Sequence, residues 1–72
     1  MSTQNLVINN TIQANMNAMR DMLEKAATLA KEGCGYMDDG NRNAAIGSII
    51  DLDRLLGDAK VLREASLAIH RQ

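Results

Sequence analysis

The chain has 72 residues, with 8 Lys and Arg against 9 Asp and Glu and a formal net charge of −1. A chain of this length forms one domain and buries only about 60% of its unfolded surface when compact, which argues against a deep active site. The apolar fraction of 46% is too high for a disordered chain. The balanced charge argues against electrostatic binding of nucleic acid.

The N-terminal sequence predicts neither export nor membrane insertion. Leu6-Val7-Ile8 is far shorter than the apolar core of a secretion signal, and no stretch approaches the ~18 apolar residues of a membrane span. Cys34 is the only cysteine, so it cannot form a disulfide within the chain. These features predict a cytoplasmic protein that has no membrane partner.

The first predicted helix covers about residues 9–32 and follows an N-terminal arm or helix extension at residues 1–8. Two adjacent heptad seams run along it, one interrupted at Asn15, and the combined stripe is wide enough to contact more than one neighbour. The first seam comprises Ile12, Met16, Met19, Leu23, Ala26 and Ala30, and the second comprises Ile8, Ile12, Met19, Met22, Ala26 and Leu29. Gly33 is expected to end this helix as a left-handed cap.

Residues 33–41 are predicted to form a loop, because closely spaced glycines disfavour a helix. Asp38, Asp39 or Asn41 is the expected N-cap of a second helix over about residues 42–70. One face of that helix carries apolar and small side chains, which favour close approach of another helix. They are Ala45, Ile49, Leu52, Leu55, Leu56, Ala59, Leu62, Ser66 and Ile69.

A second contact is expected on another flank of the second helix. Gly47 and Gly57 lie there together with Ile50 and Val61. A glycine inside a helix costs about 1 kcal/mol relative to alanine, and such a residue is commonly retained because something packs against it.

Two helices joined by a short loop fold back as an antiparallel hairpin. One helix–helix contact does not offset the ~1–2 kcal/mol per residue of backbone ordering, and small scaffolds without disulfide or metal commonly oligomerise. The predicted fold is therefore all-α: residues 9–72 form one antiparallel helical hairpin, which dimerises into a four-helix bundle. The expected oligomer interface comprises Ile12, Met16, Met19, Leu23, Ile49, Leu52, Leu56, Ala59 and Leu62. This layout is similar to that of the Rop plasmid copy-control hairpins.

Catalytic and metal-binding residues are not recognisable in the sequence. If Gly40 is aligned with the glycine of a calcium loop, Gly35 and Ile46 occupy the first and last ligand positions, where carboxylates are needed. Cys34 and the only histidine, His70, are expected at opposite ends of the hairpin, too far apart for a catalytic pair. We therefore expect no enzyme activity, no metal and no cofactor.

The start of the second helix is the one candidate ligand site. Gly40, Asn41, Arg42 and Asn43 combine the free N–H groups of a helix N-terminus with a glycine and a cation, and such groups bind anions. Asp38 and Asp39 oppose this hypothesis by their charge.

Two functional hypotheses follow. The first is a small non-enzymatic regulatory protein, an inhibitor or adaptor of the kind that phages and mobile elements carry, whose helical-bundle surface contacts another protein. The alternative is a binder of a small anionic ligand, such as a nucleotide, at the N-terminus of the second helix.

Overall fold

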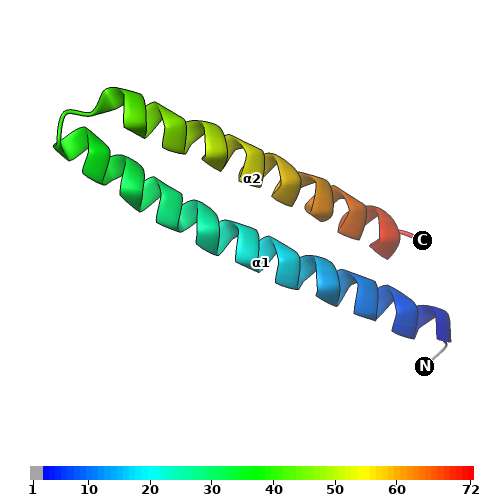
Figure 1. Cartoon of the computed structure of the whole chain (residues 1–72). Coiled ribbons are helices and arrows are strands. Elements are labelled where there is room, and N and C mark those ends of the chain that lie inside the picture. Colours follow the sequence, from blue (N-terminus) through cyan, green and yellow to red (C-terminus); the bar gives the residue numbers. More distant parts are fainter. Residues whose placement is uncertain (1–2) are drawn as a thin grey trace.

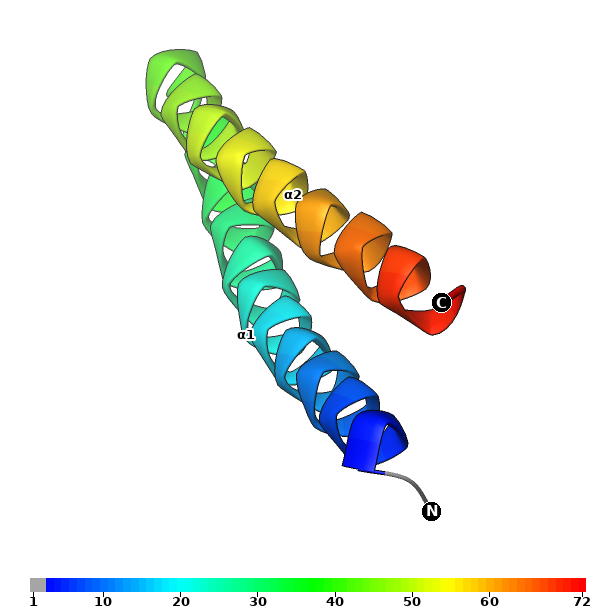
Figure 2. The same cartoon turned by 90° about the vertical axis from the view of Figure 1, so that its right-hand side faces the viewer.

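The computed structural model describes residues 3–72 and consists of two long helices (Figure 1). Helix α1 spans Thr3–Asp38 and helix α2 spans Arg42–His70. Both views show the helices side by side in opposite directions, with one tight loop at one end and both chain termini at the other (Figures 1 and 2). The predicted all-α fold and the antiparallel hairpin are confirmed.

Helix α1 includes the described part of the predicted helix extension at its start and continues past its predicted end. Its first turns begin at Thr3, so the described part of the expected arm is helical, and residues 1–2 of that arm lie outside the described residues. At the other end the helix continues through Gly33 and Gly35 to Asp38. The predicted helix end at residue 32 and the predicted loop over residues 33–41 are therefore wrong, whereas the predicted bounds of α2 are confirmed.

Gly33 stays helical because it lies in the contact with α2. A Cβ atom built on Gly33 would lie 3.6 Å from the Cβ of Ser48, which is an ordinary van der Waals distance. The distance places Gly33 in the contact between the two helices, at a point where a small side chain would also fit. We infer that this contact and the continued helical hydrogen bonds offset the cost of about 1 kcal/mol for a glycine inside a helix.

The loop is short because one glycine ends α1 and the next residue begins α2. Gly40 has a φ of 75°, the left-handed conformation that glycine adopts without strain. Its N–H donates to the carbonyl of Met37 (3.0 Å), and the N–H of Asn41 donates to the carbonyl of Tyr36 (2.8 Å), which is the Schellman pattern. The Asn41 side chain then accepts a hydrogen bond from the N–H of Ala44 (3.2 Å) and caps α2.

The two helices meet along one continuous heptad seam. Asn15 contacts Ser66 and Gly33 lies beside Ser48, and eighteen residues separate these two contacts on each helix. One register therefore holds between these two contacts, and it brings the second predicted seam of α1 against α2. Asn15, which was expected to interrupt that seam, belongs to it.

Close approach in this seam is achieved with little burial. The buried hydrophobic residues of the described chain are Ala26, Ala45, Leu55 and Ala59, and three of these four are alanines. The radius of gyration is 16.6 Å, against about 11 Å for a compact chain of this length. The accessible surface is 5419 Å², against roughly 4,400 Å² for a compact protein of this mass. A single hairpin therefore has almost no enclosed core.

A polar pair fixes the register of the seam. The amide Nδ2 of Asn15 donates to Oγ of Ser66 (3.0 Å), and the Ser66 hydroxyl donates in turn to the carbonyl of Leu62 (2.8 Å). A slip of one heptad would place Asn15 opposite Ala59, whose side chain accepts no hydrogen bond. A polar pair inside a helix–helix seam selects one alignment in this way.

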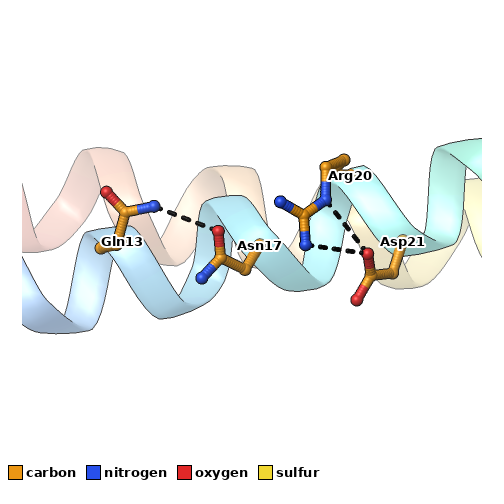
Figure 3. Close-up of polar contacts among 4 residues, drawn as sticks. All are labelled: Gln13, Asn17, Arg20 and Asp21. Atoms are coloured by element: carbon orange, nitrogen blue, oxygen red, sulfur yellow. Dashed lines mark hydrogen bonds and ion pairs between the residues drawn. The ribbon is translucent and has the colours of Figure 1, made fainter.

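We expect a double-mutant cycle of Asn15→Ala and Ser66→Ala to give a coupling of about 1 kcal/mol, measured by urea unfolding at fixed protein concentration. The matched control is Gln13→Ala with Asn17→Ala. Gln13 donates to Asn17 at a similar 3.1 Å, but on the exposed side of α1 (Figure 3). That cycle should give less than about 0.5 kcal/mol. Equal couplings in the two cycles would contradict a role for the Asn15–Ser66 pair in fixing the register.

Candidate functional site

One side of the hairpin carries a row of exposed apolar side chains from each helix. On α1 they recur at every seventh residue, and on α2 two further residues share the same spacing. Ala30 and Met37 of α1 line one groove together with Ile49 of α2, so the two rows lie on the same side of the molecule. We call this set the apolar face: Met16, Leu23, Ala30 and Met37 of α1, with Ile49 and Leu56 of α2.

The opposite side of the hairpin is polar. There the residues that border the seam include Lys25 and Glu32 on α1 and Asp51 and Asp58 on α2, and all four are exposed. The difference arises because the helices are antiparallel. In such a pair, the residues that border the seam on one flank of α1 lie on the same side of the hairpin as the residues on the corresponding flank of α2. The hairpin therefore has one apolar and one charged side, although each helix taken alone carries mixed residues.

The large residues of the apolar face are about half exposed. The exposed fractions are 50% for Leu23, 47% for Leu56 and 55% for Ile49. Near the loop the face contains a groove of about 400 Å³. Small residues, Gly33 and Ala45 among them, line this groove together with the larger Ile49, so the apolar face is hollowed at that end.

The structure divides the predicted oligomer interface into two groups. Some of its residues are buried or half-buried in the contact between α1 and α2: Ile12, Met19, Leu52, Ala59 and Leu62. The others are exposed on the apolar face: Met16, Leu23, Ile49 and Leu56. Met37 was missed because the loop was predicted to begin at residue 33, although its seven-residue spacing from Ala30 was a signal for the extended helix.

The face changes character toward the chain termini. On α2 the next residue in the row after Leu56 is Arg63, followed by His70. Arg20 and Lys60 lie at the edges of the face at a similar level, given the register of the seam. Apart from Met16, the large apolar residues of the face therefore lie in the half of the hairpin nearer the loop.

The three cations at this level differ in their partners. Arg20 holds Asp21 at 3.1 Å (Figure 3), and Arg63 lies 3.8 Å from Glu64. Within the described residues Lys60 makes no ion pair. The two ion pairs are exposed and contribute little to the free energy of unfolding. The charged side chains can therefore exchange these partners for groups on an approaching molecule.

Another exposed apolar row, which we call the outer face of α2, comprises Gly47, Ile50, Gly57 and Val61. Ile50 is 65% exposed and Val61 is 63% exposed. A Cβ atom built on Gly47 or on Gly57 would meet nothing within 4 Å. Nothing in the described hairpin therefore requires glycine at these two positions.

The residues of the predicted anion site do lie together. Gly40, Asn41, Arg42 and Asn43 line one polar hollow of about 420 Å³ at the start of α2. The backbone N–H groups of Gly40 and Asn41 donate to carbonyls of α1, and the Asn41 side chain accepts from Ala44. Fewer donors therefore face the hollow than the sequence predicted.

The described residues offer little for catalysis or for metal binding. Cys34 is exposed near the loop, and His70 lies at the far end of α2. No group of three His, Cys, Asp or Glu side chains in the described part of the chain is arranged to hold a metal ion. Neither helix, over its described length, has an apolar stretch long enough to cross a membrane.

Comparison with protein families, with curated proteins and with solved structures gives no match to this chain.

The polar hollow leads to a test of anion binding. Because several N–H groups around it are already engaged and Asp38 and Asp39 adjoin it, we expect about 1 mM ATP or inorganic phosphate to raise the Tm by less than about 1 °C. A rise of several degrees that Arg42→Ala abolishes, and that the exposed control Arg20→Ala preserves, would establish an anion site instead.

Proposed function

We propose that this chain is a small non-enzymatic interaction protein that acts as a homodimer. Two hairpins pack their apolar faces together to form a four-helix bundle, and the surface of that bundle contacts another protein. The observation that carries this proposal is the apolar face itself, on which Leu23, Ile49 and Leu56 remain about half exposed.

The free energy of burial favours such a dimer. Full burial of a Leu or Ile side chain stabilises by about 1.5–3 kcal/mol, so covering a half-exposed one contributes about 1 kcal/mol. In a two-fold dimer each such residue is covered in both copies, so its contribution counts twice. The excess accessible surface of the hairpin, about 1,000 Å² over a compact protein of this mass, is of the size that a protein–protein interface removes.

The partly exposed residues of the seam would complete the core of the bundle. Met19, Leu52 and Leu62 contact the other helix of their own hairpin on one side and are half-buried. A second hairpin on the apolar face would cover their remaining surface. The predicted interface residues would then share one core, in the manner of a four-helix bundle.

The outer face of α2 is the surface that we propose for another protein. It points away from α1, so it remains accessible when the apolar faces of two hairpins meet. Ile50 and Val61 are suited to an apolar contact, and Gly47 and Gly57 beside them leave room for the side chains of an approaching helix. A protein that binds a partner in this way would serve as an inhibitor or adaptor, and a cytoplasmic setting would keep the exposed Cys34 reduced.

Binding of a small anion at the polar hollow is the alternative. Its support is that Gly40, Asn41, Arg42 and Asn43 line one hollow. It ranks second because the hollow has few unused N–H donors and adjoins two carboxylates.

The dimer is tested by Leu56→Gln, with Val61→Gln as the matched control on the same helix. We expect the unmodified chain to be a dimer at micromolar concentration in light scattering coupled to size exclusion. Leu56→Gln should weaken it about 30-fold, because each copy loses about 1 kcal/mol of burial. Val61→Gln should change the dissociation constant less than about threefold.

Two results would contradict the dimer. One is a folded, unmodified chain that remains a monomer of 7.8 kDa at a concentration of about 100 μM, since a dimer with a micromolar Kd would be mostly assembled there. The other is an equal loss of self-association in the Leu56→Gln and Val61→Gln variants.

Partner binding is tested by cross-linking and mass spectrometry in lysate of the native host. We expect one protein to cross-link to the unmodified chain through α2. Ile50→Gln should lower its yield at least about tenfold, because a half-buried polar group replaces an apolar contact. Asp58→Asn, on the polar side of α2, should leave the yield unchanged. A yield that is the same for all three proteins would rule out the outer face of α2 as the contact.

A further inference from the structure

We propose that the two hairpins of this dimer are staggered. They run antiparallel with their apolar faces together, and they overlap only over the halves that carry the loops. This inference rests on the proposed dimer and specifies how the second copy is placed. Its argument comes from the apolar residues, the groove and the charges along the face.

Most of the apolar residues lie on the half of the face next to the loop, and Met16, near the level of Ser66, is the exception. Met37, Ile49, Leu56 and Leu23 follow one another from the loop toward the middle of the hairpin, according to the register of the seam. Beyond this level the row on α2 continues with Arg63. Only the loop-proximal halves can therefore cover one another without burying cations.

The groove has a complementary counterpart on the same face. Gly33 and Ala45 line it near the loop together with the larger Met37 and Ile49, and Leu23 and Leu56 are half-exposed side chains nearer the middle of the hairpin. In the staggered arrangement Leu23 and Leu56 of each copy lie against the groove of the other. Two-fold symmetry makes the two contacts equivalent, so each hollow is filled by a partner of the same chain.

The charges select the same arrangement. Arg20, Lys60 and Arg63 lie close to the middle of the hairpin, in the register of the seam. If the two hairpins overlapped along their full length in antiparallel fashion, the cations of one copy would lie against those of the other and repel them. The same repulsion would arise if both loops lay at the same end. The stagger instead brings the cations of each copy to the loop of the other, where Asp38 and Asp39 lie.

These carboxylates have charge to offer, because neither forms an ion pair within the part of the chain that the structure describes. Lys60 likewise forms no ion pair among the described residues. Opposite charges that meet across an interface fix its alignment more than they raise its affinity.

The overlap is large enough for a specific contact. It extends over about 20 residues of each helix, or about 30 Å at 1.5 Å per residue. With two helices about 10 Å apart, each copy covers about 600 Å². The total of about 1,200 Å² reaches the lower limit for stable protein interfaces.

Small-angle X-ray scattering on the unmodified protein tests the stagger. One hairpin is 57 Å long. The staggered dimer should have a maximum dimension of about 85 Å, because about 30 Å is shared. Full overlap and the arrangement with both loops at one end keep the length of one hairpin, about 60 Å, and a dimer of that length would overturn the stagger.

A distance measurement separates the failure of the stagger from that of the dimer. In a Cys34→Ala background, a spin label on Asn10→Cys lies on an exposed part of α1 far from the proposed overlap. The staggered dimer predicts a label separation of about 60 Å, and the other two arrangements predict less than about 40 Å. A short distance in an intact dimer rejects the stagger alone. Absence of any dimer, by scattering and by spin–spin coupling, rejects the proposed function as well.

Discussion

The close contact of α1 and α2 through small residues is the constraint on which the rest of the structure depends. Gly33 faces Ser48, and Ala26, Ala45 and Ala59 are buried along the same line. Small side chains bring two helices together but remove little apolar surface from water. The hairpin therefore encloses little apolar volume, and several of its large hydrophobic side chains lie exposed at the flanks of the seam.

Because the helices are antiparallel, the two flanks of the seam form one apolar and one charged side of the hairpin. Leu23 and Leu56 fall on one side, and Lys25 and Asp58 fall on the other. A helix that is apolar over a wide arc normally has more than one neighbour, and in this hairpin each helix has one. Self-association is the simplest way to cover such a surface, because the same apolar face is present on every copy.

The loop is short, and its brevity lengthens α1. Gly40 and Asn41 end one helix and begin the next within a few residues, so α1 reaches as far as Met37 and Asp38. The extension adds Met37 to the apolar face and forms the hollow groove beside it. It also brings two carboxylates to the same end of the molecule. The end with the loop therefore combines part of the apolar face with two carboxylates.

The periodicity of the sequence was sufficient to predict the helical class, the hairpin and the bounds of α2, because heptad spacing and the Asn41 cap are local signals. It also indicated which residues are apolar enough to form an interface, but not which of them the hairpin uses itself. The continuation of α1 past Gly33 needed the tertiary structure. Gly33 is expected to end a helix from its own preference, and only the tertiary structure shows that it lies beside Ser48 in the contact with α2. Asn15 likewise reads as an interruption until Ser66, far away in the sequence, accepts its hydrogen bond. Local preference decides which residues become helical and, through Gly40 and Asn41, where α1 ends and α2 begins, whereas contacts across the hairpin decide which face is left exposed.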